Sequence, residues 1–325
     1  MVWQTTVYDR RLAVMTALLL DPIYQQHDPG PGHPESVQRH VAITKALTEA
    51  GIVAKTQAIA PRSATLDEIA LCHDRGYIKI AKDDVESGLD DLSTGDTNIC
   101  PRSYDVAMQA VGGVLNAVDA VFAGKATNAF CAVRPPGHHA RPAQGMGFCL
   151  FNNIAIAARH AQQKHGAQKI AIVDWDVHHG NGTQDIFYED GSVLFCSTHQ
   201  SPLYPFTGHV NETGTGKGLG STLNLPFPAR TGMSTIGAAF TDRLLPAIDQ
   251  FKPDLILISA GFDSRIDDPL GQFRLTDDDF VALTKLLLES AATHCESRLV
   301  SILEGGYNLS GLASAVTAHV QTLLG

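Results

Sequence analysis

The sequence predicts an α/β protein with a mainly parallel central sheet and helices on both of its faces. Short apolar runs alternate with helical patterns along the chain. The runs are apolar at nearly every position, which is typical of parallel strands buried on both faces. Polar segments rich in glycine follow most of the runs. Since open α/β sheets bind ligands at the carboxyl ends of their strands, we expect the chemistry there.

The expected elements follow one another without a repeat, a low-complexity tract or a linker, so we expect a single domain over residues 1–325. The strands are the apolar runs 12–20, 127–133, 169–174, 192–198, 221–225, 254–259 and 298–303. The helices are 36–50, 103–123, 153–165, 234–250, 276–292 and 308–324. The long segments without a pattern, which we expect to form functional loops, are 21–35, 83–102, 136–150, 199–220 and 261–275.

Composition and charge restrict the classes of partner. The hydrophobic share is 44% and the net charge is −10. An acidic chain disfavours nucleic acid as the main partner and permits basic ligands such as lysine peptides or polyamines. The six cysteines form no Cys-x-x-Cys pair, so we expect free thiols and a reducing, cytoplasmic compartment. No run is expected to span a membrane.

A metal site is predicted where the run 169–173 ends. Side chains repeat every two residues along a strand, so Asp174, Asp176 and His178 can project to one side. Asp263, shortly after the run 254–259, is the candidate for a third ligand of the metal. Oxygen and nitrogen ligands with an open position suit Zn²⁺ and leave Fe²⁺ and Mn²⁺ open. We expect Asp174 to orient a neighbouring histidine or to hold a monovalent cation.

Two adjacent histidines, His138 and His139, follow a Pro-Pro-Gly turn at another predicted strand end. Amide hydrolysis at a metal needs a base, an acid and a group that stabilises the oxyanion. A carboxylate partner such as Asp174 would favour the imidazolium, whereas a neutral amide such as Asn181 would not. We therefore expect His139 to be the general base and His138 the more cationic partner. Tyr307, after two glycines at a fourth strand end, is a candidate donor to the oxyanion.

Together these segments resemble the histone deacetylase family, within the arginase/deacetylase fold. The resemblance runs in order from about residue 20 to the end of the chain. It rests on the segments His33–Glu35, Arg134–Ala140, Gly147–Cys149, Asp174–Gln184, Ala260–Asp263 and Glu304–Tyr307. Asn181 and its segment are similar to class II enzymes, in particular to the tubulin-deacetylase-type catalytic domain and its bacterial relatives.

The resemblance implies Zn²⁺ on Asp176, His178 and Asp263, a His138–His139 dyad, and Tyr307 as the group that polarises the carbonyl. It also implies residues that bind substrate, with two phenylalanines as the walls of an acyl-lysine tunnel: Gly147, Phe148, Phe206, Leu270 and Asp96. It further implies an inner K⁺ site at Asp174, Ser197 and the backbone of Asp176, His178 and Thr198, and an internal acetate channel at Arg39.

The expected activity is removal of acetyl, or a related short acyl group, from lysine side chains of peptides or proteins. The alternative is an acetylpolyamine deacetylase, but Leu270 stands where polyamine-selective relatives carry a glutamate. An arginase-like ureohydrolase would need further aspartates at positions that hold Gly180 and Arg265. A non-catalytic module that binds acyl-lysine is the last alternative. The sequence leaves the oligomeric state open.

Overall fold

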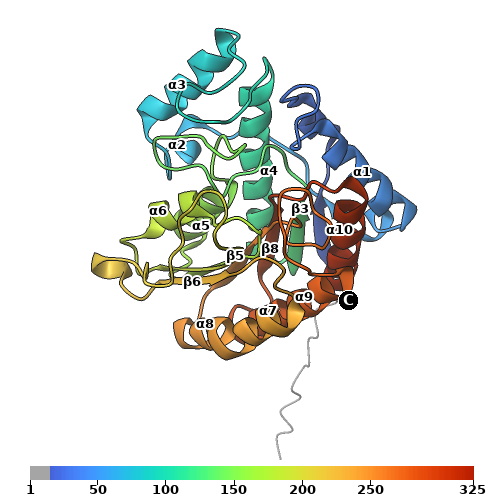
Figure 1. The fold of residues 1–325 in the computed structure, drawn as a ribbon, viewed down its shortest axis with the longest axis vertical. Helices are drawn as coiled ribbons and strands as arrows, with labels where there is room; N and C mark the ends of the chain where they lie inside the picture. The colour runs from blue at the N-terminus through green and yellow to red at the C-terminus, as the bar shows by residue number, and fades with distance from the viewer. Residues whose placement is uncertain (1–14) are drawn as a thin grey trace, which may run out of the picture.

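The structure is a computed structural model that describes residues 15–325. In this part of the chain, eight strands form one sheet in the order β2-β1-β3-β8-β7-β4-β5-β6 (Figure 1). Every pair of neighbouring strands is parallel. The strands are β1 (Thr16–Leu19), β2 (Gln57–Ala58), β3 (Asn128–Cys131), β4 (Ile170–Asp174), β5 (Val193–Gln200), β6 (Thr222–Phe227), β7 (Leu255–Ala260) and β8 (Leu299–Leu303). The predicted α/β class with a parallel sheet is confirmed.

Helices surround this sheet (Figure 1). They are α1 (Val37–Glu49), α2 (Leu66–Ile69), α3 (Arg75–Glu86), α4 (Ser103–Phe122), α5 (Asn153–His165), α6 (Asn181–Phe187), α7 (Met233–Ala239), α8 (Leu245–Phe251), α9 (Asp277–His294) and α10 (Leu309–Leu324). Buried side chains of α2 to α5 join one apolar core, and those of α1 and α7 to α10 join a second.

The six inner strands, β1, β3, β4, β5, β7 and β8, contribute to both cores, which explains why the runs are apolar at nearly every position. In β4, Ile170 and Ile172 belong to the core with α4 and α5, whereas Ala171 and Val173 belong to the core with α9 and α10. All four side chains are fully buried. Alternate residues of a strand point to opposite faces, so a sheet covered on both sides has no polar face.

The predicted helix 234–250 differs in its middle. It is α7, one π-helical turn (Phe240–Leu244) and α8 in direct succession. Pro246, at the second position of α8, has no backbone N–H and its ring crowds the carbonyl four residues earlier, which accounts for the irregular turn before it.

Other sequence predictions need correction. The first residues of the predicted strand 12–20 lie outside the described residues, and β1 covers Thr16–Leu19. The predicted loop 83–102 is wrong at its start because α3 extends to Glu86. Many side chains of α3 are charged. The apolar residues that indicate a helix are confined to its one buried face, which includes Tyr77, Ile78 and Ala81. The short elements β2, α2 and α6 were also missed.

The expectation that no stretch is long and apolar enough to cross a membrane was too strict. By length and composition α4 meets that requirement, but 72% of the stretch is buried inside the fold. Its apolar side chains pack in the core that it shares with α5 and the sheet. The apolar character of α4 is therefore explained by the core.

A buried ionic network ties the segment before α1 to the sheet. The Glu35 carboxylate accepts hydrogen bonds from Nε of Arg134, at 2.5 Å, and from Nη1 of Arg39, at 2.9 Å. Arg39 also donates to the carbonyl oxygens of Gly306 and Glu304, at 2.6 and 2.5 Å. The side chains of Glu35, Arg39 and Arg134 are fully buried. One carboxylate therefore bridges two guanidinium groups, which hold the loops after β3 and β8.

We expect Glu35→Gln to lower the free energy of unfolding by about 3–5 kcal/mol, because it leaves two buried guanidinium groups without a counter-charge. Burial alone would raise the pKa of Glu35, but Arg134, His27 and Arg39 bring it well below its usual value. This stabilisation is therefore complete above the unfolded-state pKa of about 4.3 and is lost as the pH falls below it.

Denaturant unfolding at neutral and acidic pH checks this expectation. Glu49→Gln, which removes an exposed Lys45–Glu49 pair, is the matched control and should change stability by no more than about 0.5 kcal/mol. Equal stability of Glu35→Gln and the control at neutral pH would contradict the assignment.

Candidate active site

The carboxyl ends of four neighbouring strands converge on one site. In the sheet, β3, β8, β7 and β4 lie side by side in that order. The chain leaving β3 carries His138 and His139, the chain leaving β8 carries Tyr307, the chain leaving β7 carries Asp263, and β4 leads into Asp174–His178. Parallel strands end at the same edge of a sheet, so residues far apart in the sequence meet there.

The three predicted metal ligands lie together. One ligand atom from each of Asp176, His178 and Asp263 lies within 4.8 Å of the other two, and all three residues are buried. His178 Nδ1 lies 3.1 Å from Asp176 Oδ1 and 3.1 Å from Asp263 Oδ2. The N–H of Gly305 donates to Asp176 Oδ2 and that of Val177 to Asp263 Oδ1, both at 2.9 Å. The backbone therefore fixes both carboxylates.

The donor set and its surroundings fit a divalent cation. Two carboxylates and one imidazole are a usual ligand set for such an ion. Burial and the Asp176 carboxylate raise the pKa of Asp263 to about 7, which reflects repulsion that a cation would relieve. Both carboxylates also lie close to the backbone of Gly305. A Cβ at this position would overlap Asp263 Oδ2 and lie 2.7 Å from Asp176 Oδ2. Glycine at this position is required for the two carboxylates to approach each other.

The two histidines of the dyad have different partners. Nδ1 of His138 lies 3.0 Å from Asp174 Oδ2, whereas Nδ1 of His139 lies 2.8 Å from Asn181 Oδ1. Burial alone would lower the pKa of His138, but the carboxylates of Asp176 and Asp174 raise it to about 10. Burial and the neighbouring His138 lower the pKa of His139 well below its usual value. The surroundings therefore favour the cationic form of His138 and the neutral form of His139.

The partner of His139 also sets its tautomer. The Asn181 amide oxygen can only accept, so Nδ1 of a neutral His139 donates its proton there. The lone pair of that ring is then on Nε2, and the ring lines the cavity described next. This is the state that a general base requires.

A cavity of about 300 Å³ opens onto these groups. It is lined by Asp96, His139, Gly147, Phe148, His178, Leu203, Tyr204, Leu270 and Tyr307. The Phe148 ring meets the Tyr307 ring edge to face, with ring centroids 6.0 Å apart. Tyr204 meets His139 in the same manner at 5.3 Å. The cavity thus has aromatic walls and places His139 of the dyad, the metal ligand His178 and the predicted oxyanion donor Tyr307 on one lining.

The predicted tunnel wall Phe206 needs correction. Its side chain is 72% exposed, and it is not among the residues that line the cavity. Phe206 has a φ of 64° and its N–H donates to the carbonyl of Leu203 at 2.8 Å, so a tight turn lies between Tyr204 and Phe206. The sequence places an aromatic residue on each side of Pro205 and does not reveal which one faces inward. Tyr204 and its neighbour Leu203 are the lining residues that sequence reasoning missed.

Besides Phe148, three predicted substrate-binding residues lie at the cavity. Gly147 and Leu270 line it beside Asp96. The carboxylate of Asp96 accepts hydrogen bonds from the N–H of Gly147, at 2.8 Å, and from the Tyr204 hydroxyl, at 3.1 Å. Asp96 therefore joins the two loops that form opposite walls, and its contact with substrate stays a prediction.

The predicted K⁺ ligands and Arg39 lie around the same centre. Asp174 and Ser197 are register partners on β4 and β5, and Thr198 follows Ser197. Asp174 Oδ1 accepts a hydrogen bond from the N–H of Asp176, at 3.1 Å. Arg39 is fully buried, with its guanidinium 5.1 Å from the centre of the Tyr307 ring, so it is not a solvated residue at a helix start. The K⁺ site and the acetate channel stay predictions.

Glu304 is a further residue of the site, and sequence reasoning assigned it no role. Its Oε2 accepts hydrogen bonds from the N–H groups of Gly137, at 2.7 Å, and His138, at 3.1 Å. The carboxylate at the end of β8 therefore fixes the turn that presents the dyad. Its position directly before Gly305-Gly306 was the signal that could have found it.

Comparisons with known proteins agree with this geometry. The family model described as the histone deacetylase domain matches residues 33–323. A probable deacetylase of Archaeoglobus fulgidus is 40% identical over 300 residues, which cover 92% of this chain and 83% of that protein. The human Polyamine deacetylase HDAC10 is 41% identical over 302 residues, 90% of this chain and 44% of its own length.

A solved structure extends the similarity to the whole fold. The HDA15 HD domain superposes with a TM-score of 0.91 and 36% sequence identity, covering 96% of this chain and 90% of that one. The matched family model includes every strand end that contributes to the site. The chain therefore belongs to the histone deacetylase family and is a hydrolase that acts on amides.

Proposed function

We propose that the protein is a zinc-dependent deacylase that removes acetyl, or a related short acyl group, from lysine side chains of peptides or proteins. The observation that carries the proposal is the cavity of about 300 Å³ with His139, His178 and Tyr307 on its lining. The lysine stem is a chain of apolar methylenes, which the Phe148 and Tyr204 rings on the same lining suit.

Asp176, His178 and Asp263 would hold the ion. When bound, it would polarise the amide carbonyl and make a water molecule more acidic. The neutral His139 accepts the proton of the attacking water, and the cationic His138 stabilises the negative charge that develops. Burial, reinforced by Asp263, raises the pKa of the Tyr307 hydroxyl well above its usual value, so it stays a neutral donor to the carbonyl oxygen. The protonated dyad then delivers a proton to the departing amine.

An acetylpolyamine is the second candidate substrate. It is favoured by the name of the human relative and by Asp96, a carboxylate on the cavity lining. However, both carboxylate oxygens of Asp96 already accept hydrogen bonds, and Leu270 offers no charge to a distal ammonium. These two observations support acyl-lysine over polyamine.

We further propose that K⁺ binds beside the catalytic ion, at Asp174 and Ser197 with the backbone of Asp176, His178 and Thr198. The register of β4 and β5 supports this proposal because it sets Asp174 opposite Ser197. A cation there would act on the dyad through Asp174, the partner of His138.

Metal binding is tested with Gly305→Ala. The added methyl overlaps the Asp263 carboxylate, so we expect zinc affinity to fall at least about tenfold. This is the lower end of the effect that is typical when the surroundings of metal ligands are disturbed. The measurement is zinc content after dialysis against a zinc buffer. Gly76→Ala in α3, where a Cβ would meet no atom within 4 Å, is the matched control. Unchanged zinc affinity in Gly305→Ala would count against the ligand set.

The catalytic roles are tested by steady-state kinetics on an acetyl-lysine peptide with zinc-loaded protein. We expect His139→Ala to lower kcat by about 10²–10⁴-fold, because the water loses its base. Tyr307→Phe should lower it by about 10²–10³-fold, because the oxyanion loses a donor. His294→Ala, in a surface pair with Asp249, should not change kcat. Near-normal turnover in His139→Ala would refute its assignment as the base.

Substrate class is tested by comparing kcat/KM for an acetyl-lysine peptide and for acetylspermidine. We expect the peptide to be the better substrate of the wild type. Leu270→Glu should raise kcat/KM for acetylspermidine up to about fivefold, the effect of one exposed charge pair of about 1 kcal/mol. Leu270→Gln is the uncharged control. A wild-type enzyme that strongly prefers acetylspermidine would overturn the acyl-lysine proposal.

A further inference from the structure

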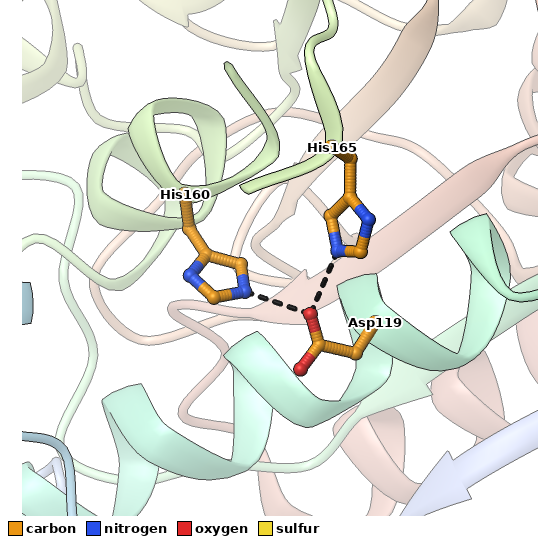
Figure 2. Close-up of side chains that lie close together, drawn as sticks. All are labelled: Asp119, His160 and His165. Carbon is orange, nitrogen blue, oxygen red and sulfur yellow. Dashed lines mark hydrogen bonds and ion pairs between the residues drawn. The ribbon is translucent and has the colours of Figure 1, made fainter. Parts of the chain in front are cut away.

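A second cluster of metal-ligating side chains lies at the other end of the helices that lead away from the active site. Asp119 is in the last turn of α4, and His160 and His165 are in the second half of α5. In Figure 2 both imidazole rings, which belong to α5, point at the carboxylate of Asp119 on the neighbouring α4. The loop that carries the dyad enters α5 at Asn153, about 18 Å along the helix axis from His165. The cluster is therefore separate from the catalytic centre.

The spacing of the three groups is close to that of a metal site. Nε2 of His160 and Nε2 of His165 each lie 2.8 Å from Asp119 Oδ1. Their ligand atoms all lie within 4.8 Å of one another. In a tetrahedral zinc site with bonds of about 2.0–2.2 Å, ligand atoms lie about 3.3–3.5 Å apart. A shift of about 0.5 Å or slightly more would accommodate the ion.

We propose that Asp119, His160 and His165 bind a divalent transition-metal ion, Zn²⁺ in particular, which links α4 to α5. Three protein ligands leave a fourth position for water. The imidazoles favour Zn²⁺ and its neighbours in the first transition series over Mg²⁺ or Ca²⁺.

The surroundings hold the three groups in the form and orientation that a ligand needs. The His165 ring is stacked on Phe122, with centroids 4.6 Å apart and ring planes at 4°. Lys164 donates to the other carboxylate oxygen, Asp119 Oδ2, at 2.7 Å and leaves Oδ1 to the histidines. Burial would raise the pKa of Asp119, but its hydrogen bonds to Lys164, His160 and His165 lower it to about 2. Burial lowers the pKa of His160, which favours the neutral ring.

An ion can reach the cluster from solvent. A cavity of about 420 Å³ is bounded by His160, Lys164, Asp67 and Glu68, together with Leu71 and Gln163. The side chain of Lys164 is 52% exposed, so it can move aside without losing contact with water.

Such an ion would stabilise the helical layer that supports the active-site loops. The backbone chain enters α4 shortly after Asp96 and enters α5 shortly after the dyad turn. A link at the far ends of the two helices fixes their relative position without touching the substrate cavity. We expect zinc to raise the melting temperature through this site and to leave turnover unchanged.

Calorimetric titration with Zn²⁺, on protein that already holds one equivalent of zinc per chain, tests the proposal. We expect one further binding event per chain. His165→Phe keeps the stacking on Phe122 and removes the nitrogen ligand. The zinc affinity of the further site should therefore fall by more than the roughly 10–100-fold that is lost when a residue hydrogen-bonded to a metal ligand is removed. Asp119→Asn should have the same effect. His294→Phe is the matched control, since His294 also hydrogen-bonds one carboxylate, Asp249 Oδ1 at 2.7 Å.

Melting curves with and without added zinc provide the second readout. The wild type and His294→Phe should be stabilised by zinc beyond the effect of filling the active site, whereas His165→Phe and Asp119→Asn should not. A titration without a further binding event, or one that His165→Phe and Asp119→Asn leave unchanged, would overturn the site. Binding without a rise in melting temperature would overturn the link between the helices.

Discussion

The structure of this site depends on two buried carboxylates, Asp176 and Asp263, that are forced close together. They come from the ends of neighbouring strands, β4 and β7, and backbone N–H groups hold both in place. Two buried negative charges at this separation repel each other unless a positive charge lies between them. His178 is the only other ligand in the cluster, and a divalent cation completes it. The glycines beside these carboxylates leave room for them to lie close together, and such an arrangement favours a bound cation.

The same electrostatic logic explains the difference between His138 and His139. One oxygen of the Asp174 carboxylate accepts a hydrogen bond from the N–H of Asp176, and the other contacts the ring of His138. One histidine of the dyad therefore faces a negative charge. His139 receives only the dipole of an amide from Asn181. Two adjacent residues of one turn therefore carry different charges, and the division of acid and base roles follows from their partners.

Much of this arrangement was predictable from the sequence because the catalytic residues directly follow apolar runs. The strand period sets Asp176 and His178 on one side, and the ends of parallel strands meet, so Asp263 could be assigned from its place after another run. Residues in long loops could not be placed in this way. The inward side chain beside Pro205 is Tyr204 rather than Phe206 because the backbone reverses at Phe206. The role of Glu304 depends on contacts with Gly137 and His138, distant in sequence, and α3 was hidden because most of its surface is charged.

The most direct test of the central claim is a crystal structure of zinc-loaded protein with anomalous scattering measured on both sides of the zinc absorption edge. The account predicts a zinc peak bonded to one oxygen of Asp176, one oxygen of Asp263 and a ring nitrogen of His178, at about 2.0–2.2 Å. A zinc-loaded crystal that shows no peak between these three side chains, or that shows them moved apart, would contradict it.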